Sequence, residues 1–286
     1  MKKVVYLLIS VLTVAMFCHN GWTERVVTEG LVSYWTFDWQ DVAGDKVIDV
    51  WGENNGTIIG NPKAINGQVG EALEFDGLDD YVNLTNLGDF GSQIGASTFE
   101  AWIKTGFKED WMTFFKVIDA DCVGWGMDFN ASMRPVNRLV FAEDAINFYI
   151  KYKIGEHGCG ASNSGSSFSI FDGEWHHIVY VQEPYVDKAE REWRVEAIYI
   201  DGEQHNLGRS TSTPKPIFIP FTEPVYLGAG NNRGKAEGFF HGIIDEVRIY
   251  NRPLTDDEVL QNFEIGLSVE AVQKLPTVWG ALKTKL

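Results

Sequence analysis

The sequence predicts an all-β protein, a two-sheet antiparallel sandwich closed by a short C-terminal helix. Short runs rich in β-branched and aromatic residues recur along the 286-residue chain, and Gly, Asn or Asp separates one run from the next. Such regular spacing is typical of a sandwich. Helical periodicity is nearly absent before residue 255. No change of composition divides the body, so we expect one domain over residues 30–265, between a signal peptide at 1–22 and a tail at 266–286.

Each expected strand is a run of strand-forming residues between turn residues. In chain order the strands lie near residues 31–37, 56–59, 72–76, 81–84, 98–104, 112–118, 125–129, 138–142, 147–153, 175–182, 195–200, 203–207, 225–229 and 238–250. The connections include a Gly/Ser-rich loop at 155–167, a charged hairpin loop at 184–194 and a proline-containing edge segment at 214–224. After Pro253, Thr255 and Glu258 form a capping box, which predicts a short helix ending near Phe263.

The last expected strand carries a carboxylate in an apolar setting. Successive side chains of a strand point to opposite faces, so Asp245 should share a face with Ile243, Val247 and Ile249. An unpaired carboxylate on such a face is costly. We therefore expect Asp245 to have a partner such as a cation.

Several motifs occur in a fixed order along the chain. They are Gly30–Asp38, the turn Asn54–Thr57, Gly70–Val82, Thr98–Ile103, Asp172–Ile178 and Ile198–Gly202, followed by the long last strand and its helix. Together they resemble the laminin-G-like, concanavalin A-like jelly rolls of bacterial secreted and surface proteins. The resemblance implies a jelly-roll sandwich across residues 30–263. It says little about function, because this fold is used by lectins, adhesion modules and hydrolases alike.

The N-terminus predicts export. Lys2 and Lys3 precede an apolar run from Val4 to Phe17, which has the length of a signal-peptide core and is too short to span a membrane. Cys18 would permit a lipoprotein instead, although a bulky Phe17 precedes it where a small residue is normally needed. No other segment has the apolar length of a membrane span. We expect a secreted, periplasmic or cell-surface protein.

Export leaves two cysteines, Cys122 and Cys159, in Gly-rich sequence that reads as loops. An even pair in an oxidising compartment favours a disulfide between them. The alternative is two unpaired thiols.

The chain is strongly acidic, with a formal net charge of −16. This charge argues against nucleic acid or an anionic membrane as partner, because both favour a basic surface. It suits divalent cations and neutral or basic ligands. The simpler explanation for most of these carboxylates is solubility.

Catalysis is not expected. Laminarinase-type β-glucanases of this fold carry Glu-x-Asp-x-Glu or Glu-x-Asp-x-x-Glu on one strand, where alternate acids can act on a glycosidic bond. The nearest match here is Glu74-x-Asp76-x-x-Asp79, in which the last acid is Asp and Gly77 interrupts the strand. No other catalytic motif is present.

Calcium is the expected cofactor. In β-glucanase relatives a structural calcium is held by an aspartate of the final strand, with backbone oxygens from the first strand and a glycine turn. The resemblance places Asp245 at that aspartate and suggests Asp38 and the turn Asp76–Gly77 as companions. Alternatively, the companions Asp38 and Asp76 make only the turn hydrogen bonds that Asp commonly makes.

Aromatic side chains outside the strand interiors are candidate sugar-stacking groups, namely Trp39, Trp51, Trp111 and Trp125. The sequence therefore favours a non-catalytic module that binds a glycan or a glycosylated surface. The alternatives are an adhesion or structural module that binds protein without a sugar site, and a β-glucanase-like hydrolase.

Overall fold

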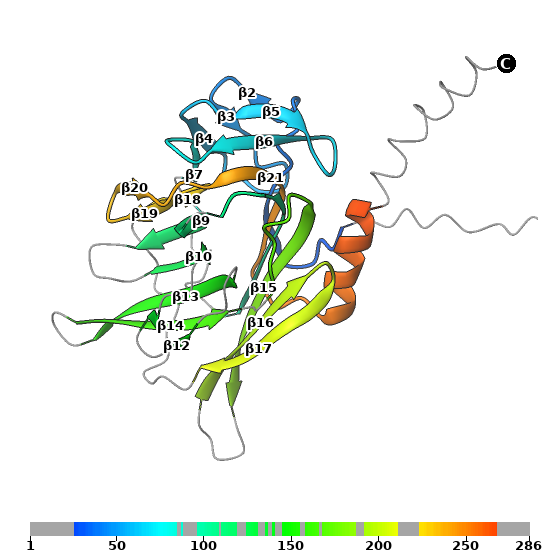
Figure 1. Ribbon diagram of the computed structural model, residues 1–286. Coiled ribbons are helices and arrows are strands. Elements are labelled where there is room, and N and C mark those ends of the chain that lie inside the picture. The colour runs from blue at the N-terminus through cyan, green and yellow to red at the C-terminus, as the bar shows by residue number, and fades with distance from the viewer. Residues whose placement is uncertain are drawn as a thin grey trace, which may run out of the picture.

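The computed structural model describes residues 26–84, 87, 96–108, 110–118, 124–130, 135–136, 139–140, 145–154, 158–165, 168–186, 192–210 and 223–267. These residues form two large sheets packed face to face, with one helix outside the first sheet (Figure 1). The predicted all-β, two-sheet sandwich with a C-terminal helix is confirmed.

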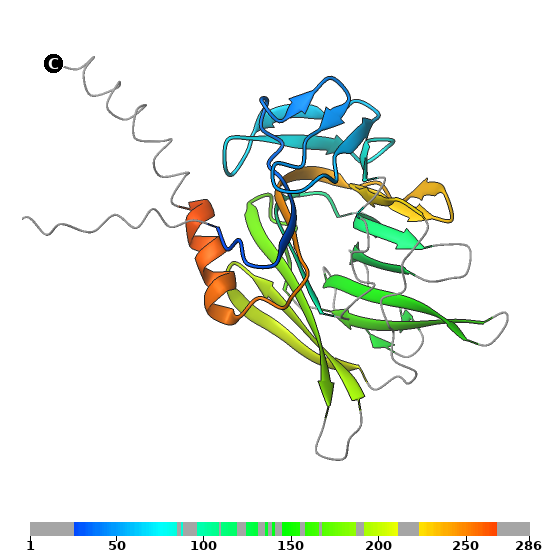
Figure 2. The same cartoon turned by 180° about the vertical axis from the view of Figure 1, so that it is seen from behind.

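The first sheet has the strand order β17-β16-β15-β8-β21-β6-β5, and β1 pairs with β21 off this path. Its strands are β1 (Leu31–Trp35), β5 (Lys63–Asn66), β6 (Glu71–Asp76), β8 (Ser97–Lys104), β15 (Trp175–Val186), β16 (Glu192–Ile200), β17 (Glu203–Ser210) and β21 (His241–Tyr250). The opening strand runs antiparallel to the closing one, with Leu31 opposite Tyr250. The two ends of the domain thus meet in one sheet (Figure 2).

The second sheet has the order β14-β13-β10-β9-β18-β7-β4-β3-β2, with β19 and β20 attached at β9. Its strands are β2 (Val42–Ala43), β3 (Lys46–Val47), β4 (Gly56–Ile59), β7 (Tyr81–Leu84), β9 (Asp110–Ile118), β10 (Gly124–Asn130), β13 (Ala145–Ile154), β14 (Gly158–Gly165), β18 (Val225–Leu227), β19 (Gly230–Asn232) and β20 (Lys235–Glu237). Two further short strands, β11 (Pro135–Val136) and β12 (Leu139–Val140), pair with each other. The β19–β9 pair is parallel and the other pairs are antiparallel.

The main core lies between the two sheets. Its largest side chains are aromatic, and Trp35, Phe75 and Phe115 are fully buried. Phe99 of the first sheet stacks on Phe115 of the second with ring centroids 4.1 Å apart. Burial of such rings supplies the main driving force for closing the sandwich.

A second apolar layer lies on the outer face of the first sheet, under the helix over residues 256–267. Thr255 and Glu258 form the predicted capping box, in which the Glu258 N–H donates to Thr255 Oγ1 (3.3 Å) and the Thr255 N–H donates to Glu258 Oε2 (2.9 Å). Phe263 stacks on Trp102 of β8, and the helix continues beyond its predicted end to residue 267, with Gly266 lying against the Trp102 indole. Within the described part of the chain, no helix is long and apolar enough to cross a bilayer.

The predicted alternation along the last strand is wrong at its centre. Asp245 lies opposite Trp102, but Arg248 lies opposite Glu100, so β21 has one residue more than β8 between these pairs. This β-bulge contains Glu246, whose φ of 53° lies in the left-handed region. Relative to the predicted alternation, side chains before and after the bulge are out of step, so residues expected on one face of the sheet lie on opposite faces.

As a result Asp245 does not share a face with Val247 and Ile249. Those two residues pack into the main core, while Asp245 lies on the outer face with Trp102, near the helix. Arg248 also points outward, where it donates to Glu100 (2.9 Å) and Glu246 and lies over the Tyr34 ring. The charged residues of this strand thus form a buried network outside the sandwich core.

Two predicted loops are partly strand. The Gly/Ser-rich segment at 155–167 contains β14, because its backbone pairs with β13 through residues 158–165. Gly and Ser are tolerated there because β14 is an edge strand of its sheet. The loop predicted at 184–194 is shorter in the structure, because β15 and β16 pair as far as Val186 and Glu192. The last strand begins at His241 rather than at 238.

Candidate functional site

Asp245 is a buried carboxylate with an incomplete set of partners. Its Oδ2 accepts a hydrogen bond from the Val69 N–H (3.0 Å), and its Oδ1 has no hydrogen-bond partner among the described residues. Burial, and next the charge of Glu246, raise the pKa of Asp245 well above its usual range. A carboxylate in this position either holds a proton or needs a cation.

A tight turn brings Asp38 to the same place. The Gly67 N–H donates to the Gly70 carbonyl (2.9 Å), and the Glu71 N–H donates to Asp38 Oδ1 (2.8 Å). Burial raises the pKa of Asp38, and the charge of Asp38 in turn contributes to the raised pKa of Asp245. We call Asp38, Asp245 and the turn 67–71 the acidic turn site.

Both glycines of this turn are required by the two carboxylates. A Cβ on Gly67 would lie 2.5 Å from Asp245 Oδ2, and a Cβ on Gly70 would overlap Asp38 Oδ1. Gly70 also has a φ of 61°, which favours glycine. The turn is therefore shaped around two acidic side chains.

The other expected calcium companions lie elsewhere. Asp76 pairs with His241 at the end of β6 that is remote from the turn 67–71. There Asp76, Asp79 and Asp80 place carboxylate oxygens within 4.8 Å of one another, the one such acidic group found among the described residues. Their oxygens accept turn hydrogen bonds, with the Leu78 N–H donating to Asp76 Oδ1 (2.8 Å) and the Asp76 N–H donating to Asp80 Oδ2 (3.1 Å). The structure thus brings Asp245 together with Asp38, but not with Asp76 and Gly77.

A cavity of about 290 Å³ opens beside this acidic group. It is lined by Asn61, Lys63, Glu74, Phe75, Asp76, Asp79, Asp80, Phe107 and His241. We call it the rim cavity. Its polar wall comes from β5, β6 and the β6–β7 turn, and its aromatic wall comes from Phe107 and His241. It therefore combines hydrogen-bond acceptors with an apolar surface.

The aromatic wall is built by local hydrogen bonds. Thr105 Oγ1 donates to the His241 carbonyl (2.7 Å) and accepts from the Phe107 N–H (3.1 Å). This holds the Phe107 ring parallel to the His241 ring, with an interplanar angle of 10°. Gly77, with a φ of 77°, lies close to His241, and a Cβ added at residue 77 would be 2.8 Å from the His241 Cβ. Phe107 remains 48% exposed, so its ring is accessible to a ligand.

Phe107 and His241 were not predicted as site residues, because Phe107 is an isolated aromatic residue in a short loop and carries no motif. The turn 67–71 was not predicted either, although Gly67 and Gly70 directly before a strand were a usable signal for a tight turn.

Of the four tryptophans expected to bind a ligand, the structure describes the side chains of Trp39 and Trp51. Trp39 is 71% exposed beside the acidic turn site, where its backbone N–H donates to Glu71 Oε2 (3.4 Å). Trp51 is 51% exposed, but its indole N–H donates to the Leu31 carbonyl (2.9 Å). Trp111 and Trp125 lie on the neighbouring strands β9 and β10, and their side chains lie outside the described structure.

Other predictions fall outside the described residues. Cys122 is among them, and for Cys159 the structure describes the backbone in β14 but not the side chain. The expected signal peptide at 1–22 and the tail after residue 267 are also outside. The disulfide therefore stays a prediction.

The adjacent histidines His176 and His177 are held by contacts within the fold. Burial alone would lower the pKa of His176, but hydrogen bonds to Asp201 (2.8 Å) and Asp172 raise it overall. His177 is fully buried under the helix, and this burial lowers its pKa to about 4. They point in opposite directions across β15, so they do not form a catalytic pair.

Comparison with known proteins identifies the family. The family model described as the concanavalin A-like lectin/glucanases superfamily matches residues 75–260. None of the curated proteins matches the sequence.

Solved structures with the same fold include binding domains of botulinum neurotoxins. The binding domain of serotype D/C VPI 5993 is 13% identical with a TM-score of 0.54, covering 83% of this chain and 52% of that one. The binding domain of neurotoxin DC in complex with SialylT is 12% identical with a TM-score of 0.55 and the same coverage. The type G receptor-binding domain is 12% identical with a TM-score of 0.52, covering 82% and 51%. This chain spans about half the length of those chains, and at such identities the likeness concerns the fold. By the family match, the chain belongs to the concanavalin A-like lectin/glucanase superfamily.

Proposed function

We propose that this chain is a non-catalytic binding module of a secreted or cell-surface protein and that it recognises a glycan. The superfamily is named for lectins and glucanases, so binding and hydrolysis of carbohydrate are the two functions that its description suggests. The fold alone does not choose between them or against a protein-binding module, and the choice depends on the site. The rim cavity is the observation that carries the proposal, because it offers the two kinds of contact that a sugar ring requires.

The chemistry of the rim cavity matches a saccharide. The His241 ring stacks on one face of the Phe107 ring. The apolar face of a pyranose can stack on the exposed part of Phe107. Sugar hydroxyls can donate to the carboxylates of Asp76 and Asp79, both of which are exposed. A volume of about 290 Å³ suits a terminal sugar unit better than a long chain.

The acidic wall also predicts which glycans bind. The cavity contains Glu74, Asp76, Asp79 and Asp80 against the single cation Lys63 among its lining residues. Such a wall repels anionic sugars and favours neutral or amino sugars. Because one similar fold was solved with SialylT, a screen should contain sialylated glycans beside neutral ones.

Two carboxylates of the rim cavity, Glu74 and Asp76, are engaged in contacts within the fold. Glu74 is paired with Lys63 at 3.4 Å on the surface. Asp76 accepts the turn hydrogen bond from Leu78, so its orientation serves the β6–β7 turn. Retaining glycosidases need two carboxyl groups about 5–5.5 Å apart across a substrate cleft, with one held as an acid. The Glu74 and Asp76 contacts favour binding over hydrolysis.

We also propose that the acidic turn site holds a structural calcium ion. Asp245 Oδ1 is buried without a partner, and the side chain of Asp38 lies on the same turn. The turn adds backbone oxygens, so the donors are all oxygen, the ligand type that calcium prefers. When bound, calcium would neutralise both carboxylates and tie the first strand to the last. Asp245 and Asp38 would hold it.

A glycan-array screen followed by binding measurements tests the proposed function. Phe107→Ala and Asp79→Asn should each weaken binding at least tenfold, while Trp39→Ala, which removes an exposed ring at the acidic turn site, should leave binding unchanged. Loss of binding in Trp39→Ala alone would move the site away from the rim cavity. Release of reducing sugar from a β-glucan, lost in Glu74→Gln, would show that the chain is a hydrolase instead.

A further inference from the structure

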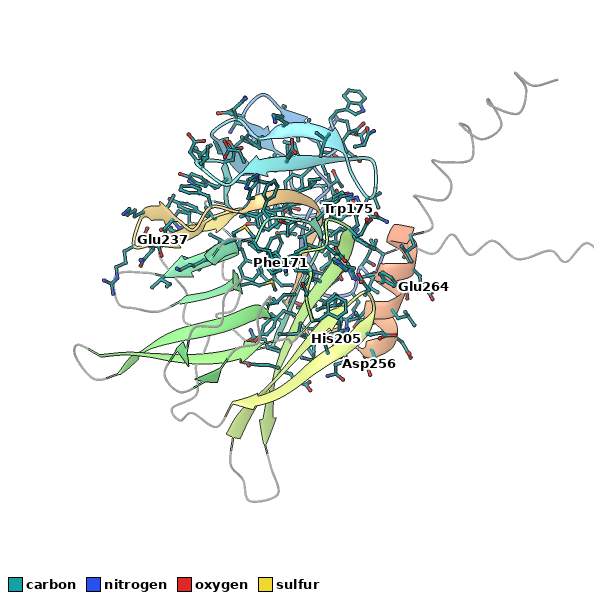
Figure 3. All side chains as sticks on the ribbon, in the orientation of Figure 1. Phe171, Trp175, His205, Glu237, Asp256 and Glu264 are labelled. Atoms are coloured by element: carbon teal, nitrogen blue, oxygen red, sulfur yellow. The ribbon has the colours of Figure 1, made fainter. Side chains whose placement is uncertain are left out.

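A second cavity lies on the opposite face of the first sheet from the sandwich core. Its volume is about 610 Å³, and it is lined by Val181, Glu183, Ala197, Tyr199, Gln204, Pro253, Leu254, Thr255, Asp256 and Asp257. It lies where the segment entering the helix crosses β15, β16 and β17. Figure 3 shows Asp256 at this end of the helix and Glu264 towards the other end. We call this cavity the helix groove.

The floor of the helix groove is apolar. Val181, Ala197, Tyr199 and Leu254 each have relative exposures between 3% and 6% and belong to the apolar layer under the helix. Because these side chains are already largely buried, little of their apolar area remains to be removed from water, but a polar group seated on them would lose its hydrogen bonds to water. The floor therefore favours an occupant with apolar side chains.

The rim of the helix groove is acidic. Glu183, Asp256 and Asp257 are exposed, and the lining contains no Lys or Arg. Asp256 accepts a hydrogen bond from the Tyr199 hydroxyl at 2.6 Å. The neighbouring cation Arg252 is engaged by Glu258 at 2.7 and 2.8 Å, so it does not neutralise this rim.

The helix explains only part of this charge. Acidic residues in the first turn are favoured by the helix dipole, which accounts for Asp256 and Asp257. Glu183 lies on β15, a separate element, on the same outer face as Val181. Glu183 lines the same cavity as Tyr199. Burial and the hydrogen bond to Asp256 raise the pKa of Tyr199, and the charge of Glu183 adds to this effect. Three carboxylates from two elements thus surround one apolar floor.

The chain itself contains a segment with the complementary chemistry. Residues 268–286 carry three lysines and one glutamate, in a protein whose formal net charge is −16. Near the lysines Lys283 and Lys285, the segment has Trp279 and Leu282 as large apolar side chains. A basic, apolar segment matches a groove with an apolar floor and an acidic rim.

The segment is also long enough to reach the groove. The helix over 256–267 extends about 18 Å at 1.5 Å per residue, so its end lies about that far from Asp256. The sixteen residues from 268 to Lys283 span up to about 50 Å when extended. Return of the lysines to the start of the helix is therefore geometrically allowed.

We propose that the segment 268–286 of the same chain docks in the helix groove, with Trp279 or Leu282 on the apolar floor and Lys283 and Lys285 paired with Glu183 and Asp257. Docking would cover the outer face of β15 and β16 beside the helix. It would also leave the rim cavity, which lies at the β6–β7 turn, free for its own ligand.

Zero-length carbodiimide cross-linking of the full chain, with peptide mapping by mass spectrometry, tests the proposal. Lysine–carboxylate cross-links should join Lys283 or Lys285 to Glu183, Asp256 or Asp257 within monomers. The double variant Glu183→Gln, Asp257→Asn should lose the links at these two positions. Glu264→Gln, an exposed acid towards the other end of the same helix, should keep them (Figure 3).

Three results would overturn the proposal. Absence of groove cross-links in the folded full chain would show that the segment lies elsewhere. Equal cross-linking to Glu264 and to the groove acids would indicate random encounter. Groove cross-links confined to covalent dimers would show that the groove takes the segment of a second copy. Thermal unfolding of each variant distinguishes loss of docking from loss of the fold.

Discussion

Replacement of Asp245 by asparagine should stabilise the metal-free protein and abolish its response to calcium. The folded-state pKa of Asp245 is raised, so between the unfolded and folded pKa values the folded chain holds a proton that the unfolded chain releases. The free energy of unfolding of the metal-free wild type therefore falls as pH rises from about 4 through the raised pKa of Asp245. Asparagine removes this part of the fall.

The magnitudes follow from the contacts of Asp245. Its Oδ1 is one buried polar atom without a partner, which costs on the order of 1–3 kcal/mol or more when the group is charged. Calcium at a hundredfold excess over its Kd should stabilise the wild type by about 2.7 kcal/mol, if it binds only the folded state. For a domain of this size that is a rise in Tm of about 5–11 °C.

Differential scanning calorimetry at pH 7, with chelator and with calcium, measures both effects. Asp76→Asn is the matched control, because Asp76 lies at the other end of β6 in a second acidic group. The calcium response should vanish in Asp245→Asn and persist in Asp76→Asn. The reverse pattern would place the metal at the β6–β7 turn, and no response in the wild type would remove calcium from this protein.

Three further outcomes are expected. Gly70→Ala should lower the free energy of unfolding by more than 1 kcal/mol, because the φ of 61° at residue 70 disfavours alanine. It should also weaken calcium binding, because the new Cβ overlaps Asp38 Oδ1 in the acidic turn site. Calorimetry with and without calcium measures both effects. Glu258→Gln should lower the free energy of unfolding by about 1 kcal/mol at pH 7 and not change it below about pH 2. The hydrogen bond with Arg252 lowers the pKa of Glu258 to about 2, and its stabilising effect is lost as the carboxylate protonates. Urea unfolding at several pH values measures the difference. Protein folded in an oxidising compartment should show no reactive thiol from Cys122 or Cys159, and thiol titration that finds two would exclude their disulfide.

The sequence was sufficient for the sandwich because its main strands, such as β8 and β21, are rich in β-branched and aromatic residues and are separated by clear turn residues. It was not sufficient for the faces of the last strand. Alternation assumes a regular strand, and the bulge at Glu246 adds one residue that no local sequence signal marks. Asp245 was correctly expected to be buried at a cost, but its neighbours are the turn 67–71 and Trp102 on the outer face of the sheet rather than the sandwich core.

The candidate site was harder to predict than the fold, because it joins residues that are distant in sequence. The turn 67–71 meets Asp245 only because β6 pairs with β21, and that pairing depends on the whole sheet order. Phe107 meets His241 through Thr105, a contact between residues 136 positions apart. The edge strand β14 was missed for a different reason, since its glycines and serines have low strand propensity and only its pairing with β13 makes it a strand.

The rim cavity should bind a neutral or amino sugar without cleaving it. A crystal structure of the protein soaked with the best neutral oligosaccharide from a glycan screen would show where the sugar lies and whether it is intact. An intact terminal sugar unit should stack on the exposed Phe107 ring, with its hydroxyls within hydrogen-bond distance of Asp76 or Asp79. An oligosaccharide bound at Trp39, or a cleaved product in the rim cavity, would contradict it.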